Sequence, residues 1–456
     1  MGLTLGVSLR LLQRNGKPST DDRGLGTSVA FVGAGGKTTC LFALARELPG
    51  PVLVTSTTHL GAWQLDEADA HITAAESEQL GRAARLGREK VTVITGPVGA
   101  DERTTPASAD VVEQLRDISL SRGWPLLIEA DGARQKPLKA PKENEPRIPA
   151  FTEIVAVVAG LDGLGKPLEE ASVHRAELFA PLSGLEVGDP VTEAGLGRVL
   201  AHKRGGLKGI PPRARRIAVL NKADSAPLQA SAHQIAMAIA RAYDAVVVAS
   251  AESNTVHAVM EPTAGIILAA GGASRFGKPK QLLNWLGESL IHRATRMAFG
   301  AGLSPVVVVT GARANEVEAA VGDLPVIIAR NTDWRAGQSS SIRTGLDACP
   351  PSAAAAVFLL ADQPLVTEAV IRTIVEAHAS EAAAIVAPLV QGERRGNPVL
   401  FDRETFPDLR QLSGDEGGRG IFDRHRIHYV PWHDDGILRD IDTEEDYRKL
   451  QEIQTQ

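Results

Sequence analysis

"AGIILAAGGASRFGKPK", residues 264–280, decides how the second half of this chain folds. An apolar run ends in a Gly-rich turn, and Arg275 and Lys280 follow. This order is typical of a buried strand that feeds a phosphate-binding loop, because glycine lets backbone N–H groups approach an anion closely. The stretch misses the P-loop pattern only at Pro279. Read from Leu268 to Lys280 instead, it predicts a loop that holds a triphosphate, with Lys278 on its surface.

The same pattern recurs along the whole chain. Short apolar runs such as "PLLIEADG" and "AAVFLLADQP" alternate with helix-compatible stretches. This alternation predicts an α/β fold with mostly parallel sheets covered on both faces, in which ligands bind where strands end. The polar stretch 252–265, which contains Pro262, predicts a boundary between an N-terminal domain, 1–260, and a C-terminal domain, 261–456.

Composition narrows the functional class. The chain has 456 residues and a formal net charge of −6, so we expect at least two domains and no nucleic acid as partner. Its two cysteines, Cys40 and Cys349, lie far apart and are expected to be reduced thiols. No apolar run approaches the roughly 18 residues of a membrane helix, so we expect no membrane association and a cytoplasmic location.

Three carboxylates near strand ends are candidate metal ligands in the second half. Asp362 follows "FLLA", and Asp440 and Asp442 alternate in "RDIDTEED" and so share one face of a strand. A carboxylate beside a Gly-rich loop is a natural Mg²⁺ ligand. The alternative for Asp362 is a turn or cap residue, and one of the other two aspartates could be only structural.

These motifs together resemble the MobA-like nucleotidyltransferases, in particular the molybdenum cofactor cytidylyltransferase (MocA) type, over residues 263–450. The family's Leu-Ala-Ala-Gly-x-Ser-x-Arg-Phe-Gly-x-x-Lys opening is matched except that Ala273 replaces its serine. The resemblance implies a Rossmann-like domain with catalytic Arg275, Lys280 and Asp362, and metal ligands Asp362 with Asp442 or Asp440. It further implies nucleotide-binding residues Leu268, Ala269, Ala270, Gly271, Gly272, Gly277, Asn331, Ser340 and Ser341, and acceptor-binding residues Asn397, Pro398 and Asp415.

The implied reaction is Mg²⁺-dependent transfer of CMP from CTP to molybdopterin, with release of pyrophosphate. The "LAAG…RFG" style favours cytosine, whereas guanylyl relatives tend toward "LAGG…RMG". The alternatives are a GTP:molybdopterin or other small-molecule nucleotidyltransferase, and a non-catalytic carrier or insertion chaperone for molybdenum cofactor. A molybdenum hydroxylase would be the recipient.

The first half contains a second nucleotide motif, "GAGGKTT" at 33–39, between a buried strand and a helix. Lys37 is expected to reach phosphates and Thr38 to bind Mg²⁺, while Glu129 and Asp131 are candidates for Mg²⁺ binding or water activation. "NKAD" at 221–224 matches a guanine-reading pattern, with a surface turn as the alternative, and His59 is either functional or a buried structural histidine. The predicted nucleotide-binding residues, for ATP or GTP, are Gly33, Gly36, Lys37, Thr38, Thr39, Asn221, Lys222 and Asp224.

The short P-loop spacing is similar to that of Mur-ligase-like ATP-binding proteins. With "TSTTH", "EADGARQKPLKAP" and "GLDGLGKPL", it makes residues 25–255 resemble the YqeC family, which is linked to selenium-dependent molybdenum hydroxylases. That resemblance implies a nucleotide-dependent accessory step joined to the C-terminal transferase.

Overall fold

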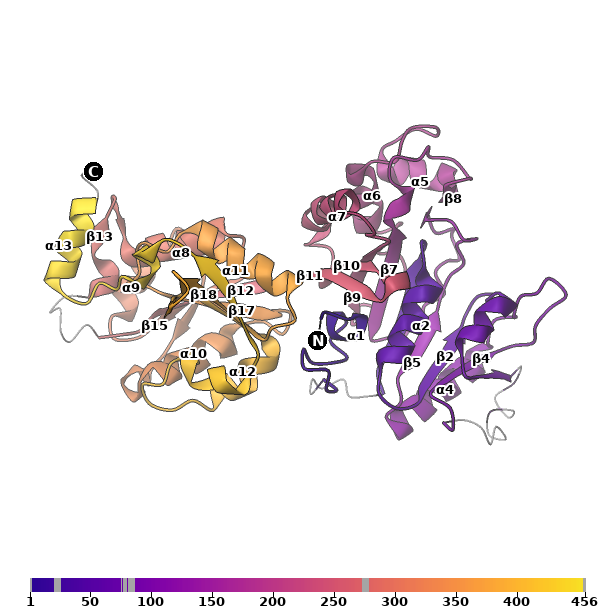
Figure 1. Ribbon diagram of the computed structural model, residues 1–456, viewed down its shortest axis with the longest axis horizontal. Helices are drawn as coiled ribbons and strands as arrows, with labels where there is room; N and C mark the ends of the chain where they lie inside the picture. Colours follow the sequence, from indigo (N-terminus) through magenta and orange to yellow (C-terminus); the bar gives the residue numbers. More distant parts are fainter. Residues whose placement is uncertain are drawn as a thin grey trace. The chain divides into compact units, whose positions relative to one another are not determined.

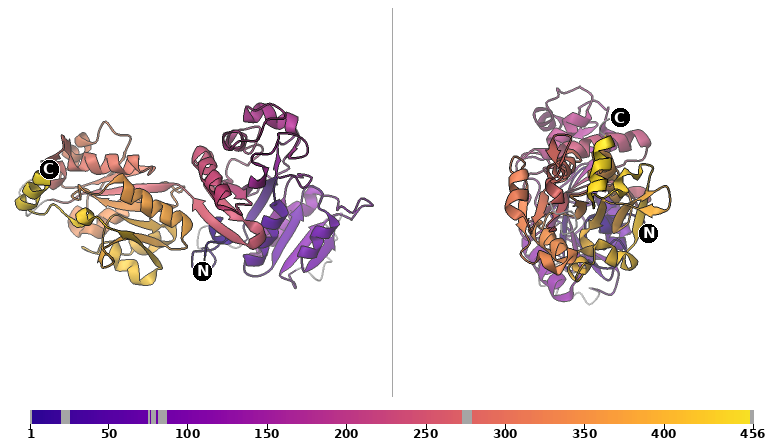
Figure 2. Two further views of the ribbon diagram at one scale, coloured as in Figure 1. Left: turned by 45° about the horizontal axis from the view of Figure 1, so that its top comes forward. Right: turned by 90° about the vertical axis from the view of Figure 1, so that its left-hand side faces the viewer.

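A computed structural model describes residues 2–19, 26–74, 76, 80, 87–272 and 279–453. The chain divides into two compact units, Met1–Met260 and Glu261–Gln456. Each unit is built on its own sheet (Figures 1 and 2).

The N-terminal unit is built on a nine-stranded sheet of order β11-β10-β9-β7-β1-β5-β2-β4-β3. Neighbouring strands are parallel except for β10 and β11. The central strands are buried on both faces, as their continuous Val, Ile and Leu runs require. The strands are β1 (Ser28–Gly33), β2 (Val52–Ser56), β3 (Ala70–Thr73), β4 (Val91–Thr95), β5 (Leu126–Glu129), β7 (Ile154–Gly160), β9 (Arg215–Asn221), β10 (Ala245–Ser250) and β11 (Thr255–Met260); β6 (Leu138–Lys139) pairs with β8 (Val173–His174) outside the sheet.

Helices of the N-terminal unit connect these strands. Helix α2 begins directly after the Gly-rich loop, at a point where Gly36 has a φ of 106° that other residues rarely adopt. Helix α4 starts at Ser108, whose hydroxyl accepts from the Val111 N–H, and ends at Gly123 in the left-handed conformation. The helices are α1 (Leu5–Ser8), α2 (Lys37–Glu47), α4 (Ala109–Arg122), α5 (Ala176–Ser183), α6 (Glu193–Ala201) and α7 (Ala226–Ile239).

The C-terminal unit is built on a mixed sheet of order β16-β15-β12-β17-β20-β18-β19, with β21 beside β18. β12 is parallel to both of its neighbours, and β20 is antiparallel to β17 and β18. The strands are β12 (Thr263–Ala269), β15 (Val306–Thr310), β16 (Ile327–Arg330), β17 (Ala355–Leu360), β18 (Ile385–Val390), β19 (Arg394–Arg395), β20 (Val399–Asp402) and β21 (Ile427–Trp432); β13 (Asn284–Trp285) and β14 (Glu288–Ser289) form a separate hairpin.

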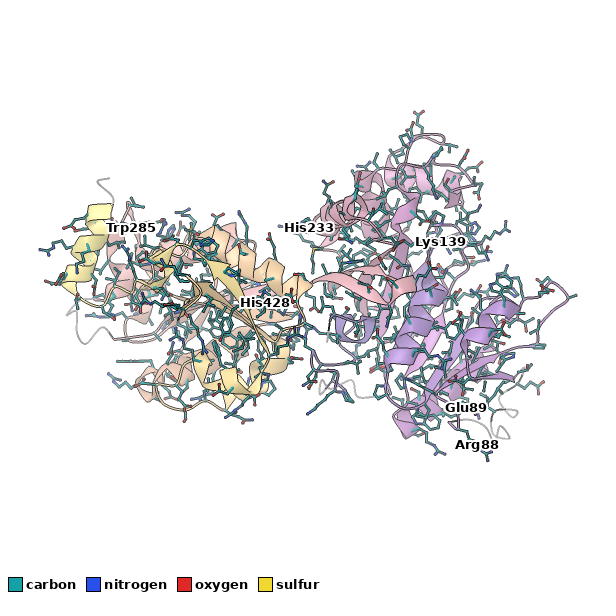
Figure 3. All side chains as sticks on the ribbon, viewed as in Figure 1. Arg88, Glu89, Lys139, His233, Trp285 and His428 are labelled. Carbon is teal, nitrogen blue, oxygen red and sulfur yellow. The ribbon has the colours of Figure 1, made fainter. Side chains whose placement is uncertain are left out.

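Two hydrophobic cores enclose this second sheet. Alternate residues of β12 serve the two faces: Ile267 packs in one core with α8 and α11, and Ile266 packs in the other with α10 and α12. Figure 1 shows these helix pairs on opposite faces of the strands. Trp285 lies beside the last helix (Figure 3) in a small satellite cluster. The helices are α8 (Leu290–Gly300), α9 (Ala314–Ala320), α10 (Gln338–Ala348), α11 (Glu368–Ser380), α12 (Phe406–Arg410) and α13 (Glu444–Ile453).

The strand order of the C-terminal sheet contains a reversal that matters for ligands. From β12 the chain moves outward through β15 to β16, then crosses to β17 on the other side of β12. A crevice opens at such a point beyond the carboxyl ends of the strands. The prediction of an α/β fold with parallel-rich sheets is confirmed. Within the described residues, no helix is long and apolar enough to cross a membrane.

Candidate functional site

β12 ends at Ala269, at the reversal point of the sheet. Arg275 and Gly277, and the rest of 273–278, lie outside the described residues. Leu268, Ala269 and Ala270 run up to this loop at the end of the strand. The buried Gln281 amide donates to the carbonyl oxygens of Ala269 at 3.2 Å and Gly271 at 3.1 Å, and so ties the two ends of the loop together. Sequence reasoning missed Gln281, although a glutamine directly after Lys280 at the loop exit was a usable signal.

Lys280 lies between two of the predicted carboxylates. Its Nζ is 3.8 Å from the Asp362 Oδ2 and forms an ion pair and a short hydrogen bond with Asp442. Burial raises the pKa of Asp362, the Asp440 and Asp442 charges raise it further, and Lys280 opposes the rise. The structure therefore brings Lys280, Asp362 and Asp442 together at the carboxyl end of β17.

Asp440 lies on the same edge but is held differently. The Gln363 Nε2 donates to the Asp440 Oδ1 at 2.6 Å, while the Gln363 Oε1 is buried without a hydrogen-bond partner among the residues that the structure describes. Gln363 matches the family motif in "ADQP" beside Asp362, but the sequence predicted no role for it.

These residues fit a divalent cation held jointly with a ligand's phosphates. Among the described residues, no three or more His, Cys, Asp or Glu side chains form a cluster that could hold a metal ion by themselves. Asp362 and Asp442 nevertheless converge on one cationic group, the Lys280 ammonium. Mg²⁺ is commonly bound by one or two carboxylates plus substrate phosphates, so an incomplete protein cage is what such a site requires.

Asn331, Ser340 and Ser341 are brought together, and they bond mainly to one another. The Asn331 Nδ2 donates to the hydroxyls of Ser340 at 2.8 Å and Ser341 at 3.0 Å, and its Oδ1 accepts from the Asp333 N–H at 2.9 Å. Trp334 lies against Gly272, where an added Cβ would be 3.0 Å from the indole ring. This group therefore shapes the segment between β16 and α10 beside Gly272.

The residues predicted to bind the acceptor substrate come from two segments of the C-terminal unit. Asn397 and Pro398 directly precede β20, and because β20 runs antiparallel to β17, its start lies at the edge where β17 ends. Asp415 is exposed in the loop that touches the start of α10, where the Ser339 N–H donates to the Gly414 carbonyl at 3.1 Å. Gly337, with a φ of 99°, allows this approach, because an added Cβ would lie 2.3 Å from the Gly414 backbone.

In the N-terminal unit, Lys37 and Asp131 form a buried ion pair at the Gly-rich loop. The Lys37 Nζ donates to the Gly33 carbonyl at 2.9 Å and lies 3.3 Å from the Asp131 Oδ1. The same carboxylate accepts from the Gly33 N–H at 3.0 and 3.1 Å. Thr39 is exposed in the first turn of α2.

Thr38 and Glu129 form the second pair at this loop. The Thr38 hydroxyl donates to the Glu129 Oε2 at 2.7 Å. Burial raises the pKa of Glu129, and the Lys37 charge and the Thr38 hydrogen bond oppose the rise. A hydroxyl and a carboxylate at the start of a helix that follows a glycine loop are the groups that bind a phosphate-associated cation.

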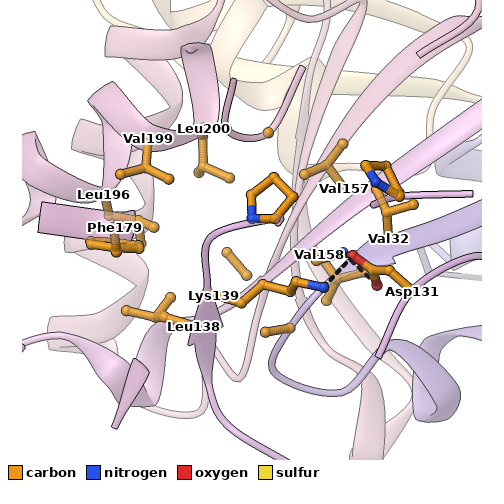
Figure 4. A pocket seen from close by; sticks show the side chains of 17 residues that line it. Val32, Asp131, Leu138, Lys139, Val157, Val158, Phe179, Leu196, Val199 and Leu200 are labelled. Carbon is orange, nitrogen blue, oxygen red and sulfur yellow. Dashed lines mark hydrogen bonds and ion pairs between the residues drawn. The ribbon is translucent and has the colours of Figure 1, made fainter. Parts of the chain in front are cut away.

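Sequence reasoning missed the charges that extend this network. The Lys139 Nζ is 2.7 Å from the Asp131 Oδ2 and 3.2 Å from the Glu145 Oε2, which also accepts from Arg175 at 2.8 Å. Lys139 is buried, and it contacts Asp131 directly at the lining of a small cavity (Figure 4). The cavity has a volume of about 40 Å³ and is lined mainly by apolar side chains, so it has room for a few water molecules and not for a nucleotide. The segment around Lys139 thus carries a buried charge.

The "NKAD" residues lie in three different environments. The Asn221 Nδ2 donates to the Gly35 carbonyl at 2.8 Å, and its Oδ1 accepts from the Ala251 N–H at 2.9 Å. Lys222 pairs with Asp162 at 2.9 Å, and Asp224 is exposed. Asn221 thus supports the Gly-rich loop directly. His59 is exposed rather than buried, and its Nδ1 lies 2.8 Å from the Thr104 carbonyl oxygen.

Comparison with known proteins defines the class to which each half belongs. Residues 265–429 match the MobA-like NTP transferase domain, and residues 29–177 match the YqeC protein family. The chain belongs to both families, as a YqeC domain joined to a MobA-like nucleotidyltransferase domain.

Three relatives show the extent of the likeness. The chain is 31% identical over 214 residues to the uncharacterized protein YqeC of Escherichia coli, which covers 43% of this chain and 76% of that protein. It is 31% identical over 195 residues to nicotine blue oxidoreductase of Paenarthrobacter nicotinovorans, and this alignment covers 41% of this chain and 95% of that protein. It is 24% identical over 199 residues to a probable molybdenum cofactor guanylyltransferase of Bacillus cytotoxicus, with 42% and 97% covered.

Proposed function

We propose that the C-terminal unit transfers CMP from CTP to molybdopterin and releases pyrophosphate, with Mg²⁺ as the metal. The observation that carries this proposal is the meeting of Lys280, Asp362 and Asp442 at the reversal point of the sheet, next to the loop after β12. Cations and carboxylates at such a point suit the transfer of a nucleotidyl group, which depends on positioning and on charge neutralisation.

Each side chain has a defined task in this reaction. Asp362 and Asp442, with Asp440 oriented by Gln363, would hold Mg²⁺, which would supply neutralisation of the phosphate charge. Lys280 moves from the carboxylates to the phosphates when nucleotide binds and, with Arg275, stabilises the leaving pyrophosphate. The attacking phosphate of molybdopterin is already ionised, so no general base is needed. Asn397, Pro398 and Asp415 are assigned to the acceptor.

The choice of acceptor rests on the relatives, and the choice of base on the loop. A molybdenum cofactor guanylyltransferase among the relatives supports a molybdopterin-type acceptor. The "LAAG…RFG" loop style favours CTP, and GTP is the competing nucleotide.

Incubation with Mg²⁺, molybdopterin and each NTP in turn, followed by mass spectrometry of the products, tests the proposal. The expected product is the CMP adduct with equimolar pyrophosphate. A GMP adduct without a CMP adduct would refute the cytidylyl assignment.

A carrier or insertion chaperone is separated from an enzyme by one variant. Asp362→Ala is expected to abolish pyrophosphate release, while Asp347→Ala, at an exposed residue paired with Arg410, serves as the matched control. Pyrophosphate release that survives in Asp362→Ala would favour another site, and cofactor binding without any turnover in the wild type would favour the carrier.

For the N-terminal unit we propose binding of ATP or GTP with Mg²⁺, in an accessory step of the maturation of a cytoplasmic molybdenum hydroxylase. Lys37 would bind phosphate, and Thr38 and Glu129 would hold the cation beside Asp131. The convergence of these four side chains at the end of β1 and the start of α2 supports this proposal. Calorimetric titration of wild type and Lys37→Ala with each nucleotide tests it, and equal binding in both proteins would refute it.

A further inference from the structure

A short turn outside the Gly-rich loop makes direct contact with the cation-binding hydroxyl of the N-terminal unit. The turn is η1 (Ala62–Glu67), and the Gln64 Nε2 donates to the Thr38 Oγ1 at 2.9 Å. The Thr38 hydroxyl itself donates to the Glu129 Oε2 at 2.7 Å, and the Gln64 Oε1 accepts from the Gly61 N–H at 2.8 Å. A continuous hydrogen-bond chain thus joins Glu129 to the backbone of the turn.

The turn also carries an aromatic side chain beside the hydrogen bond between Gln64 and Gly61. The Trp63 indole lies against Gly61, since an added Cβ there would be 2.4 Å from the ring, and the side chain is 54% exposed. On its other side the turn is fixed by the Ala62 N–H, which donates to the Glu102 carbonyl at 2.8 Å. Any change in how Gln64 holds Gly61 therefore alters the surroundings of Trp63.

The chemistry of the Thr38 hydroxyl makes the Gln64 contact sensitive to a cation. A hydroxyl has one hydrogen and two lone pairs. Here the hydrogen serves Glu129 and one lone pair serves Gln64, so one lone pair remains for a metal ion. A divalent cation on that lone pair withdraws electron density from the oxygen, and its charge repels the positive end of the amide N–H dipole. The Gln64 hydrogen bond weakens as the cation binds.

We propose that Gln64 is a positioning residue, and that the turn 61–67 senses a divalent cation bound with a nucleoside triphosphate at Thr38. The proposal rests on the nucleotide-binding function proposed above for the N-terminal unit. Without ligand, Gln64 orients the Thr38 hydroxyl and fixes the turn. When the cation–nucleotide pair binds, the contact between Gln64 and Thr38 breaks and the turn rearranges around Gly61 and Trp63.

The test follows the fluorescence of Trp63 in the full chain. Subtracting the signal of Trp63→Phe from that of the wild type removes the other tryptophans. We expect Mg²⁺ with ATP or GTP to change this difference signal, and the same nucleotide with EDTA to leave it unchanged. Gln64→Leu, measured against its own Trp63→Phe double variant, should lose the change while the calorimetric Kd for the Mg²⁺–nucleotide stays within about fivefold of wild type. Asp66→Asn, an exposed change in the same turn, should retain it.

The outcomes separate the two proposals. Calorimetric binding that depends on Lys37 but leaves Trp63 unchanged overturns the sensor alone. A Trp63 change that persists in Gln64→Leu overturns the role of Gln64. Binding heats that are equal in wild type and Lys37→Ala overturn the nucleotide function and the sensor together. If Gln64→Leu does not fold, Gln64→Asn, which is too short to reach Gly61 and Thr38 at once, replaces it.

Discussion

Removing the Asp131 carboxylate should destabilise the N-terminal unit more than any surface charge change. Asp131 is 3% exposed and is the shared partner of Lys37 and Lys139, which are 5% and 8% exposed. Breaking a buried ion pair by removing one partner costs about 3–5 kcal/mol, because the other charge stays buried. The Gly33 N–H also loses its acceptor, which costs about 1–3 kcal/mol.

Several remaining contacts moderate the loss in Asp131→Ala. Lys139 keeps the Gly132 carbonyl at 2.7 Å and Glu145 at 3.2 Å, and Lys37 keeps the Gly33 carbonyl. We therefore expect a loss of about 4 kcal/mol in the free energy of unfolding, a large part of the roughly 5–15 kcal/mol of a typical domain. Asp131→Asn retains an acceptor but not the charge, so its loss should be smaller.

Urea unfolding of the full chain tests this prediction. Pulsed hydrogen exchange, measured on peptides from β1 and β5, reports the unfolding of the N-terminal unit separately. Glu113→Ala is the matched control, because its ion pair with Arg116 at 3.9 Å is exposed and should be worth less than about 1 kcal/mol. The double variant Asp131→Ala/Lys139→Met removes one uncompensated ammonium and should recover part of the loss. If Asp131→Ala matched Glu113→Ala, the buried charge network would not have the energetic role that its geometry assigns to it.

Three further predictions follow from described contacts. Burial raises the pKa of Glu145, but hydrogen bonds and charges from Arg175 and Lys139 outweigh it and lower this pKa to about 2. The ionised Glu145 therefore stabilises the fold above its ordinary pKa of 4.5, and this contribution is lost as the pH falls toward 2. Solvent screens this partly exposed carboxylate, so Glu145→Gln should lower the free energy of unfolding by only about 1 kcal/mol at pH 7, and urea titrations should show this difference vanishing in acid. Gly337→Ala should destabilise the C-terminal unit by more than about 2 kcal/mol in urea and reduce CMP transfer, because φ is 99° and the added Cβ meets the Gly414 backbone. The control is Gly392→Ala, where φ is 77° and the space around the glycine is open, and it should cost only about 1–2 kcal/mol. In Asn331→Leu the bonds to Ser340 and Ser341 are lost, so the apparent KM for CTP should rise at least tenfold; an unchanged KM would contradict a role for this segment in nucleotide binding.

The strands and their sheets were predictable from the sequence because their signals are local. Apolar runs such as those ending at Gly33 and Ala269 appear as buried central strands, and the glycines after them lie at the expected edge. Parallel pairing follows from the helical segments between the runs, so the α/β architecture needed no long-range information. The assignment of individual residues to nucleotide, metal or acceptor stays a prediction.

What the sequence could not reveal depends on partners distant along the chain. Glu145 meets Arg175 across 30 residues, and Gln64 meets Thr38 across 26, although neither stretch has an internal pattern that pairs them. Asn331 illustrates a different limit: its residue type suits ligand binding, but its amide is used to hold two serines that were expected to act beside it. A polar residue in a matching motif can therefore serve the ligand by shaping its neighbours.

The connection between β11 and β12 has a consequence for biosynthesis. Only Glu261 and Pro262 separate the last strand of one sheet from the central strand of the next. During synthesis the nine-stranded sheet thus has all its strands before the second sheet has any, and N-terminal domains commonly fold first. β12 then emerges before either of its neighbouring strands, because β15 and β17 begin about 40 and 90 residues later. The delay follows from the rate of synthesis, which is ~5–20 residues per second. For several seconds, the apolar strand β12 would be without its sheet partners, although the preceding domain is already complete.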